Sequence, residues 1–365
     1  MNKGKLVLEN GKIFEGNIFG FDGNASGEVV FNTSLTGYQE ILTDPSYYGQ
    51  IIIMTYPLIG NYGVNDSDIE SDKVQVKGLI VGSYEDQWSN FNGMKSLDEY
   101  LKKNKVIAIT GIDTRALTKM IRDDGAMRGM ISSENESEKS LIDKVMKTPS
   151  MSGSDLVKFV TTKKNYEITT ENPKYKIAVY DFGIKKNILR EFQNYTVQLK
   201  VFKADSPAEE VLDYKPDGIF FSNGPGDPEA VTYGIETARV LSETGIPVFG
   251  ICLGHQLIAL ALGAKTYKLK FGHRGGNHPV KNHIKNKIEI TSQNHGFAVD
   301  EKTLDTDKVI VSHTNLYDNT NEGLRHKKYP VMSVQFHPEA SPGPNDSKYL
   351  FEEFMGMVKN YNSGL

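Results

Sequence analysis

Two short segments carry side chains whose types and spacing fit nucleophilic catalysis. The first is Gly250-Ile251-Cys252-Leu253-Gly254, in which the only cysteine of the sequence stands between two glycines. The apolar run that ends at Ile251 is typical of a buried parallel strand, and the run Leu257–Leu262, ended by Gly263, predicts a helix. A tight strand-to-helix turn with small neighbours lets the side chain at its tip stand free of the backbone.

This turn would place the Cys252 sulfur at the positive end of a helix. Backbone N–H groups there favour the thiolate, which is the nucleophilic form. The alternative is a structural cysteine that packs as a small apolar side chain, which is the usual role of a free cysteine. The turn alone does not decide between the two.

The second segment is His337-Pro338-Glu339, which follows a predicted strand Val331–Phe336. Residues i and i+2 of an extended chain point to the same side, so Glu339 can accept a hydrogen bond from the His337 ring and select its tautomer. Pro338 lacks a backbone donor, as expected where a chain leaves a sheet. Most of the other histidines are expected to fill structural or solvated positions.

A third segment, Ser222-Asn223-Gly224-Pro225-Gly226-Asp227-Pro228, follows a predicted strand Gly218–Phe221. The carboxyl ends of parallel strands meet at one edge of a sheet, where ligands bind. The glycines allow close backbone approach, so an N–H group here and the N–H of Leu253 would together form an oxyanion hole. An ordinary Gly-Pro turn is the alternative.

Length and pattern predict two domains. Residues 1–150 form a β-rich domain, 151–174 a linker and 175–365 a doubly wound, mainly parallel α/β domain in which strands and helices alternate. The expected strands of the first domain are Lys5–Leu8, Lys12–Ile18, Gly27–Asn32, Gln50–Thr55 and Val74–Val81, and its expected helices are Asp98–Lys103 and Asp113–Arg122.

The segment from Thr36 to Tyr48 in the first domain is rich in hydroxyl and turn residues. Asp44-Pro45-Ser46 favours a turn that presents the Ser46 hydroxyl, although a capped surface turn explains the same residues more simply. This half contains no phosphate-binding G-x-x-x-x-G-K-[ST] loop and no cysteine or histidine cluster with metal-ligand spacing. No metal site is expected.

Composition excludes several classes of protein. The net charge is −4, so the chain does not have the excess of basic residues that is typical of nucleic-acid-binding proteins. A single cysteine excludes an intrachain disulfide, and no signal peptide or membrane-spanning run is present in the sequence. We therefore predict a cytoplasmic protein that binds neither nucleic acid nor membrane.

Together the three segments resemble the class I glutamine amidotransferases, which use a Cys-His-Glu triad. The first half is similar to the small-subunit family of carbamoyl-phosphate synthase. The segments that carry this similarity are Phe31–Glu40, Thr43–Tyr47, Tyr56–Gly63, Gly111–Leu117 and, further on, Phe271–Val280. The resemblance spans nearly the whole chain. Arg274 departs from some relatives that carry a second histidine, and it lies outside the triad.

The resemblance implies residue roles. Cys252, His337 and Glu339 match the triad that hydrolyses glutamine. The matching glutamine contacts are Ser46 in the first domain and, in the second, Gly224, Gly226, Leu253, Gln256, Asn294, Gly296 and Phe297. If the match holds, Ser46 makes the cleft between the domains part of the substrate site.

The resemblance also implies a partner. Ammonia from L-glutamine would pass to a large synthetase subunit in a heterodimer or higher oligomer. That subunit would use ATP and Mg²⁺ to make carbamoyl phosphate for arginine or pyrimidine synthesis, so no cofactor is expected in this chain. Three alternatives stay open: an amidotransferase for another synthetase, a free-standing Cys-His-Glu hydrolase of γ-glutamyl or peptide bonds, and a non-catalytic subunit with an inactive site.

Overall fold

The computed structural model describes residues 2–364, which form two compact units. The first unit comprises Met1–Ser154 with Lys270–Gly275, and the second comprises Asp155–Leu269 with Gly276–Leu365. This division differs from the expected one in two respects. The predicted linker 151–174 belongs to the second unit from Asp155 onward, and the short segment Lys270–Gly275 groups with the first unit although it lies far along the chain.

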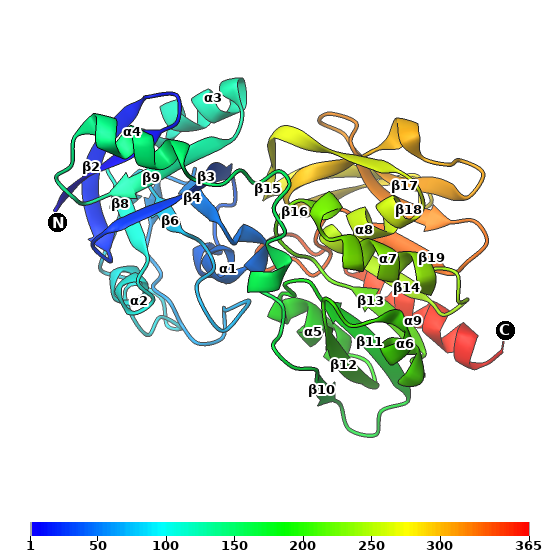
Figure 1. The fold of residues 1–365 in the computed structure, drawn as a ribbon. Helices are drawn as coiled ribbons and strands as arrows, with labels where there is room; N and C mark the ends of the chain where they lie inside the picture. The colour runs from blue at the N-terminus through cyan, green and yellow to red at the C-terminus, as the bar shows by residue number, and fades with distance from the viewer. Residues whose placement is uncertain (1, 365) are drawn as a thin grey trace. The chain divides into compact units, whose positions relative to one another are not determined.

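The first unit is built on a closed barrel with the strand order β1-β2-β8-β6-β4-β3-β9 (Figure 1). Pairs β3–β4, β4–β6 and β6–β8 are parallel, and the other pairs around the barrel are antiparallel. Its elements are β1 (Lys3–Leu8), β2 (Ile13–Gly20), β3 (Asn24–Asn32), α1 (Tyr38–Thr43), η1 (Pro45–Tyr47), β4 (Gln50–Met54), β5 (Leu58–Ile59), β6 (Gly78–Ile80), β7 (Ser83–Tyr84), α2 (Leu97–Lys103), β8 (Ile107–Thr110), α3 (Thr114–Asp124), β9 (Met127–Ser132) and α4 (Glu138–Met146).

The turn predicted at Asp44-Pro45-Ser46 is capped as expected, but it is buried and does not lie on the surface. The turn-rich segment 36–48 forms the helix α1 and the short 3₁₀ helix η1, and Tyr38, Leu42 and Tyr47 are fully or almost fully buried. The Asp44 carboxylate accepts a hydrogen bond from the Ser46 N–H at 2.9 Å, as the Asp-Pro-Ser pattern suggests. Ser46 itself is only 7% exposed, because the apolar residues around it draw the segment into the core.

The second unit contains a sheet in the order β10-β12-β11-β13-β14-β19-β18-β17-β15-β16 (Figure 1). The pairs from β12 to β19 are parallel, and the strands beyond them pair antiparallel in β10–β12, β19–β18, β18–β17 and β17–β15. Its elements are η2 (Val157–Phe159), β10 (Tyr166–Thr169), β11 (Tyr175–Asp181), α5 (Lys186–Gln193), β12 (Val197–Lys203), α6 (Ala208–Asp213), β13 (Gly218–Phe221), η3 (Pro228–Ala230), α7 (Thr232–Leu241), β14 (Val248–Ile251), α8 (Leu253–Ala261), β15 (Lys265–Asn282), β16 (Lys287–Asp300), η4 (Glu301–Thr303), β17 (Val309–Asn315), β18 (Asn321–His326), β19 (Val331–Val334) and α9 (Tyr349–Asn362). The expected mixed α/β class is confirmed.

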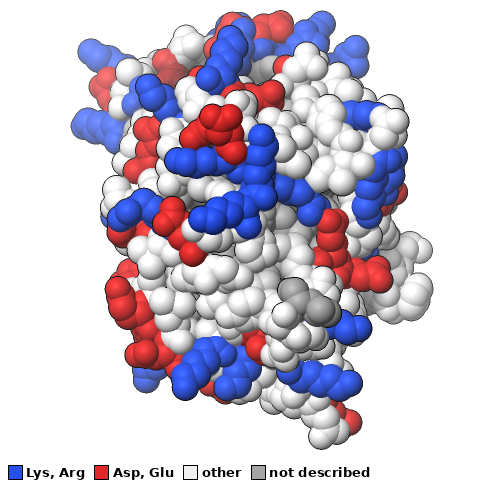
Figure 2. Space-filling view, turned by 90° about the vertical axis from the view of Figure 1, so that its right-hand side faces the viewer, with Lys and Arg blue, Asp and Glu red and all other residues white. Residues whose placement is uncertain are grey.

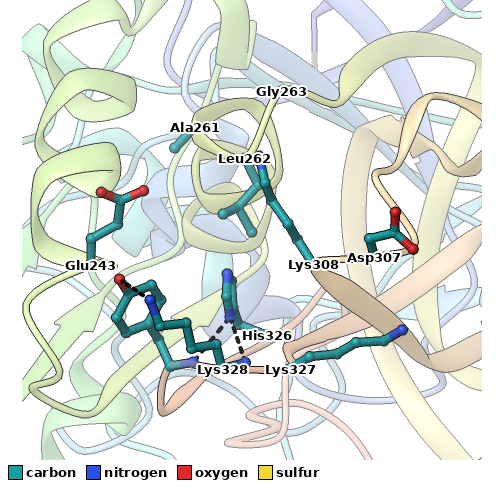
Figure 3. A pocket seen from close by; sticks show the side chains of 10 residues that line it. Glu243, Ala261, Leu262, Gly263, Asp307, Lys308, His326, Lys327 and Lys328 are labelled. Carbon is teal, nitrogen blue, oxygen red and sulfur yellow. Dashed lines mark hydrogen bonds between the residues drawn. The ribbon is translucent and has the colours of Figure 1, made fainter.

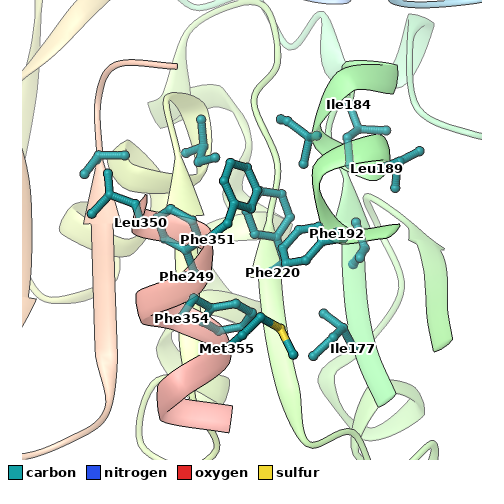
Figure 4. Packing of buried hydrophobic residues seen from close by; sticks show 14 of the residues in the cluster. Ile177, Ile184, Leu189, Phe192, Phe220, Phe249, Leu350, Phe351, Phe354 and Met355 are labelled. Carbon is teal, nitrogen blue, oxygen red and sulfur yellow. The ribbon is translucent and has the colours of Figure 1, made fainter. Parts of the chain in front are cut away.

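Two apolar clusters hold helices against this sheet. One contains buried residues of α5 and α9, and the other contains buried residues of α6, α7 and α8. In the first cluster Phe351 and Phe354 of α9 approach Phe192 and Phe249 with ring centroids 5.2–6.0 Å apart, mostly edge to face (Figure 4). Phe220 lies edge to face against the same two rings, 5.1 Å from Phe192 and 5.6 Å from Phe249. Truncation of one such buried Phe to Ala typically costs roughly 3–5 kcal/mol.

The segment predicted as a linker contains an edge strand of this sheet. Residues Tyr166–Thr169 form β10, which pairs antiparallel with β12, and the Thr162 N–H donates to the Asp181 carboxylate at 2.8 Å. The side chains of β10 are mostly exposed, so the strand lacks the apolar alternation that predicts a strand from sequence.

The outer surface of the second unit carries charges of both signs. Figure 2 shows its face near the C-terminus, where Lys and Arg side chains gather in the upper half and stand among Asp and Glu. No helix among residues 2–364 combines the length and the apolar character that crossing a bilayer requires.

Candidate active site

Cys252 lies at the tip of a strained turn between β14 and α8. Its backbone has φ 54° and ψ −104°, a conformation that costs a non-glycine residue about 1–3 kcal/mol. Backbone hydrogen bonds hold this turn. The Cys252 N–H donates to Val334 O at 2.9 Å, the Gly254 N–H to Ser222 O at 3.0 Å, and the Gln256 N–H to Cys252 O at 3.1 Å. Strain that neighbouring strands impose in this way is typical of a functional residue.

The two glycines beside Cys252 are required by space. A Cβ on Gly254 would lie 2.2 Å from Phe221 O, and a Cβ on Gly250 would lie 2.6 Å from Ile258 Cδ1. The helix α8 begins at Leu253, directly after the cysteine, whereas the apolar pattern placed its start near Leu257. The sulfur therefore lies at the N-terminus of α8, as the turn motif predicts.

If the glutamine hydrolysis that the sequence resemblance implies takes place at Cys252, Gly254→Ala should lower it about 100-fold or more, and the same variant should lower the melting temperature. The new methyl group collides with the backbone of β13, and relief of this collision displaces Cys252, for which a shift of about 1 Å is enough to cause such a loss. Gly356→Ala in α9 is the matched control, because nothing lies within 4 Å of its Cβ position. Steady-state kinetics and thermal unfolding of both variants test this expectation, and equal behaviour of the two would contradict it.

His337 and Glu339 follow β19, the strand next to β14. The ring nitrogen Nδ1 of His337 lies 2.7 Å from Glu339 Oε1. The backbone N–H of His337 donates to Ser292 O of β16 at 2.9 Å. The other ring nitrogen, Nε2, is buried and has no hydrogen-bond partner of normal geometry among residues 2–364. The Cys252 side chain nevertheless lies close enough to act on the charge of this ring. The structure thus brings the three predicted side chains together.

The charges at this edge of the sheet are strongly coupled. Burial disfavours a charged imidazole, but the Glu339 carboxylate and the Cys252 side chain outweigh burial and raise the pKa of His337 well above its ordinary value. Burial alone would raise the pKa of Glu339, but Lys185 and His337 hold it well below its usual range. An imidazolium hydrogen-bonded to a carboxylate is therefore the favoured state at neutral pH.

Lys185 is a central part of this site that no sequence pattern indicated. Its side chain is 3% exposed, and its Nζ lies 3.1 Å from Glu339 Oε1 and also donates to Ala340 O. The neighbouring Asn187 donates to Glu339 O at 2.5 Å. Both residues follow the carboxyl end of β11, and this position was the only available signal, because lysine and asparagine are common in loops.

The predicted oxyanion residues lie on two neighbouring segments: Gly224 and Gly226 on the loop after β13, and Leu253 at the turn after β14. A Cβ on Gly224 would fall 2.2 Å from Phe182 O, and Gly226 has φ 96°, so the loop requires glycine at Gly224 and favours it at Gly226. Leu253 is the first residue of α8, and the first N–H groups of a helix have no acceptor inside it. An N–H of this kind is available to an anionic atom that lies near Cys252.

The remaining predicted contact residues divide between the two units. Asn294 O lies 3.6 Å from the Cys252 sulfur, and the Gln256 amide nitrogen donates to Phe297 O at 2.8 Å. Gly296 lies between these two positions on β16. Ser46 belongs to the first unit, where it is buried in η1.

Two further histidines of the second unit are buried without charge. Burial lowers the pKa of His255 to about 3, and burial, followed by the charge of Arg325, lowers the pKa of His313 to about 3. The His255 Nδ1 lies 2.9 Å from Ser333 Oγ, and the His313 Nδ1 lies 2.9 Å from Ser312 Oγ. Both rings therefore act as neutral structural groups, as predicted for most histidines.

Because the pKa values of His255 and His313 are lowered in the folded protein, we expect the free energy of unfolding to fall in acid. A histidine with a folded pKa near 3 and an unfolded pKa near 6.5 stabilises the fold fully above pH ~6.5, and this contribution is lost as the pH falls toward 3, by up to about 1.4 kcal/mol per pH unit. We expect His255→Gln to reduce this slope in urea unfolding between pH 6.5 and 4.5. The exposed His283→Gln should keep the wild-type slope, and a wild-type slope in both variants would contradict the interpretation.

A cavity of about 500 Å³ in the second unit lies away from these residues. It is lined by Glu243, Ala261, Leu262, Gly263, Asp307, Lys308, His326, Lys327, Lys328 and Tyr329 (Figure 3). Its lysines lie near the C-terminal end of α8, where positive charge is favoured in any case. The cavity therefore does not compete with the turn at Cys252 as a catalytic site.

Comparison with known proteins assigns the class of the second unit. The family model described as glutamine amidotransferase class-I matches residues 178–357, and the model described as carbamoyl-phosphate synthase small chain, CPSase domain, matches residues 6–131. The second unit is therefore a class I glutamine amidotransferase domain.

Relatives over the full length define the family. The carbamoyl phosphate synthase small chain of Syntrophotalea carbinolica is 53% identical, with 98% of each chain covered, and that of Chlorobaculum tepidum is 54% identical, with 97% of each covered. The chain belongs to the carbamoyl phosphate synthase small chain family, and the expected resemblance is confirmed. A solved structure from Thermoplasma acidophilum, described as part of a putative GMP synthase, covers 52% of this chain and 96% of its own, at 24% identity and a TM-score of 0.45, which is too weak to add to the assignment.

Proposed function

We propose that this chain hydrolyses L-glutamine to glutamate at Cys252 and passes the ammonia to a large synthetase subunit. That subunit makes carbamoyl phosphate from bicarbonate and ATP, and it uses the Mg²⁺ that ATP chemistry requires. The observation that carries the proposal is the arrangement of His337, whose ring is hydrogen-bonded to Glu339 at 2.7 Å and interacts with Cys252 at the N-terminus of α8.

The residues suggest a sequence of steps. The Cys252 thiolate attacks the side-chain amide carbon of glutamine and forms a C–S bond. The N–H groups of Leu253 and of the Gly224–Gly226 loop hold the oxyanion, and each such donor contributes about 3 kcal/mol in measured cases. The His337 imidazolium gives its proton to the leaving nitrogen as the C–N bond breaks, and ammonia departs.

The second half of the reaction restores the enzyme. Neutral His337 takes a proton from water, the hydroxide attacks the γ-glutamyl thioester, and glutamate leaves as the thiolate re-forms. Glu339 keeps the proton-accepting nitrogen of His337 directed toward the sulfur, and Lys185 keeps Glu339 ionised. We assign contacts to the substrate to Ser46, Gln256, Asn294, Gly296 and Phe297 on the basis of family membership.

The partner follows from the chemistry of the product. Ammonia that escapes into water becomes ammonium, which lacks the lone pair needed for attack, so its delivery needs a covered path. The relatives are named as small chains, and this supports a heterodimer with a large subunit. We assign partner contact to the first domain and a doubly wound arrangement to the second, where helices pack on parallel strands. The cytoplasmic location stays a prediction.

An isotope experiment tests this proposal. The chain and the large subunit receive glutamine labelled with ¹⁵N in its amide group, together with bicarbonate, ATP and an excess of unlabelled ammonium. We expect ¹⁵N-carbamoyl phosphate from the complex and none from this chain alone. Carbamoyl phosphate made by this chain alone, or product labelled only to the extent of the mixed ammonium pool, would contradict the proposal.

A further inference from the structure

The loop after β7 in the first unit exposes large apolar side chains. We define the Phe91 loop as residues 85–95. Phe91 is 95% exposed and Met94 is 58% exposed, and Trp88 of the same loop is 37% exposed. Single exposed apolar residues are normal, but several large ones on one short loop indicate a site of interaction with another molecule.

The Phe91 loop is held in place by its own contacts. The Trp88 ring packs over Gly63 and Gly93, where an added Cβ would lie 2.8 Å and 2.3 Å from ring atoms. The Ser89 N–H donates to Asn61 O at 3.0 Å, and the Met94 N–H donates to Val64 O at 2.9 Å. The backbone of the loop that carries Phe91 is therefore held, so less conformational entropy is lost when a partner covers it.

An acidic pocket lies at the start of the same loop. It has a volume of about 380 Å³ and is lined by Asn2, Ile18, Phe19, Gly20, Asp22, Tyr84, Asp86, Asp98 and Lys102. Lys102, the one cation in this lining, pairs with Asp98 at 2.6 Å, and the Tyr84 hydroxyl donates to Asp86 at 2.5 Å. The three carboxylates leave the pocket negative, so it suits a positively charged side chain.

We propose that the Phe91 loop and this acidic pocket form the surface on which the first unit binds the large synthetase subunit. Phe91 and Met94 enter an apolar recess of that subunit, and one of its Lys or Arg side chains enters the pocket beside Asp86. This inference rests on the proposed function and names the surface that the partner uses. A projecting apolar side chain fits a recess in a protein, because it offers no concave site to a small molecule.

Charge argues against a second copy of this chain as the occupant. A symmetric dimer through this surface brings two acidic pockets together, and like charges across an interface oppose association. A partner that carries a basic rim around an apolar recess is attracted instead. The need to enclose ammonia also favours an anchor that holds the two chains together during turnover.

Binding of the full-length chain to the large subunit tests the inference. We expect Phe91→Ser to raise the dissociation constant about 30-fold, as for an aromatic residue that dominates an interface, with glutamine hydrolysis by the isolated chain unchanged. Asp86→Asn should weaken binding less and reduce its dependence on salt. Ile288→Ser on β16 of the second unit, where Ile288 is 59% exposed, is the matched control and should bind as the wild type does.

Three results would overturn the inference. These are unchanged affinity of Phe91→Ser, an equal loss in Ile288→Ser, and self-association of the wild type that Phe91→Ser abolishes while its affinity for the large subunit persists. Each leaves the glutaminase proposal intact. A wild-type chain that shows no binding to the large subunit, in contrast, would refute the proposed function itself.

Discussion

Cys252→Ser is expected to lower glutamine hydrolysis on the order of 10⁴-fold or more, because the seryl oxygen is not ionised at neutral pH and replaces the attacking thiolate. Losses of this size accompany removal of the nucleophile in other acyl-transfer enzymes. The exchange of sulfur for oxygen is small, and the backbone hydrogen bonds that hold the turn, such as Cys252 N–H to Val334 O at 2.9 Å, remain. Stability should therefore change little.

The complex supplies an internal control for this variant. The proposed function places carbamoyl phosphate synthesis from added ammonium on the large subunit alone, so Cys252→Ser in the complex should retain it fully while losing synthesis from glutamine. Initial rates with each nitrogen donor measure the two activities. Retention of glutamine-dependent synthesis by the serine variant would show that another residue performs the attack.

Lys185→Leu is expected to lower the free energy of unfolding by about 3–5 kcal/mol at pH 7, because it removes one of the two cations, Lys185 and His337, that balance the buried Glu339 charge. The wild-type pKa of Glu339 is lowered, so its ion pair stabilises the fold above the unfolded pKa and this contribution is lost as the pH falls through the folded pKa. In Lys185→Leu the pKa of Glu339 rises toward its unfolded value, so the contribution of Glu339 to the pH dependence of stability becomes smaller. Glutamine hydrolysis should also fall about 10- to 100-fold, as when groups that orient a reacting side chain are removed.

A double variant separates charge from packing. Lys185→Leu/Glu339→Gln removes both charges, so we expect it to recover much of the lost stability in urea unfolding but none of the lost hydrolysis, because His337 then loses its carboxylate partner. Lys359→Leu at an exposed position of α9 is the matched control and should change stability by less than about 0.5 kcal/mol. If Lys185→Leu is as stable as this control, the ion pair does not have the role assigned to it.

The parts of the site that sequence could predict are those set by local spacing. Two glycines around Cys252 require a tight turn, and their Cβ positions at Gly250 and Gly254 are blocked by neighbouring atoms. The two-residue spacing of His337 and Glu339 places both side chains on one side, and the 2.7 Å hydrogen bond agrees with that expectation. The catalytic roles of these residues stay predictions.

The parts that sequence could not predict depend on partners far along the chain. Lys185 is important because it meets Glu339, and nothing around Lys185 distinguishes it from a solvated lysine. Closure of the barrel in the first unit requires parallel pairing of β3, β4 and β6, which no local pattern specifies. The segment Lys270–Gly275 joins the first unit from within β15 for the same reason.

Segments with misleading composition account for the other differences. Hydroxyl and turn residues between Thr36 and Tyr48 favour a loop, but buried Tyr38, Leu42 and Tyr47 fold that segment into helices. The composition of β10 also favours a loop, but this segment forms an exposed edge strand. Backbone pairing with β12, and not burial, stabilises it. Tertiary contacts override local preference in both segments.

The most direct test of the central claim is mass spectrometry of the covalent intermediate. The chain is mixed with glutamine, quenched in acid within one turnover and digested. We predict a mass increase of one γ-glutamyl group on the peptide that contains Cys252, and its absence in Cys252→Ser. A γ-glutamyl group on any other residue, or full turnover by Cys252→Ser, would contradict the account.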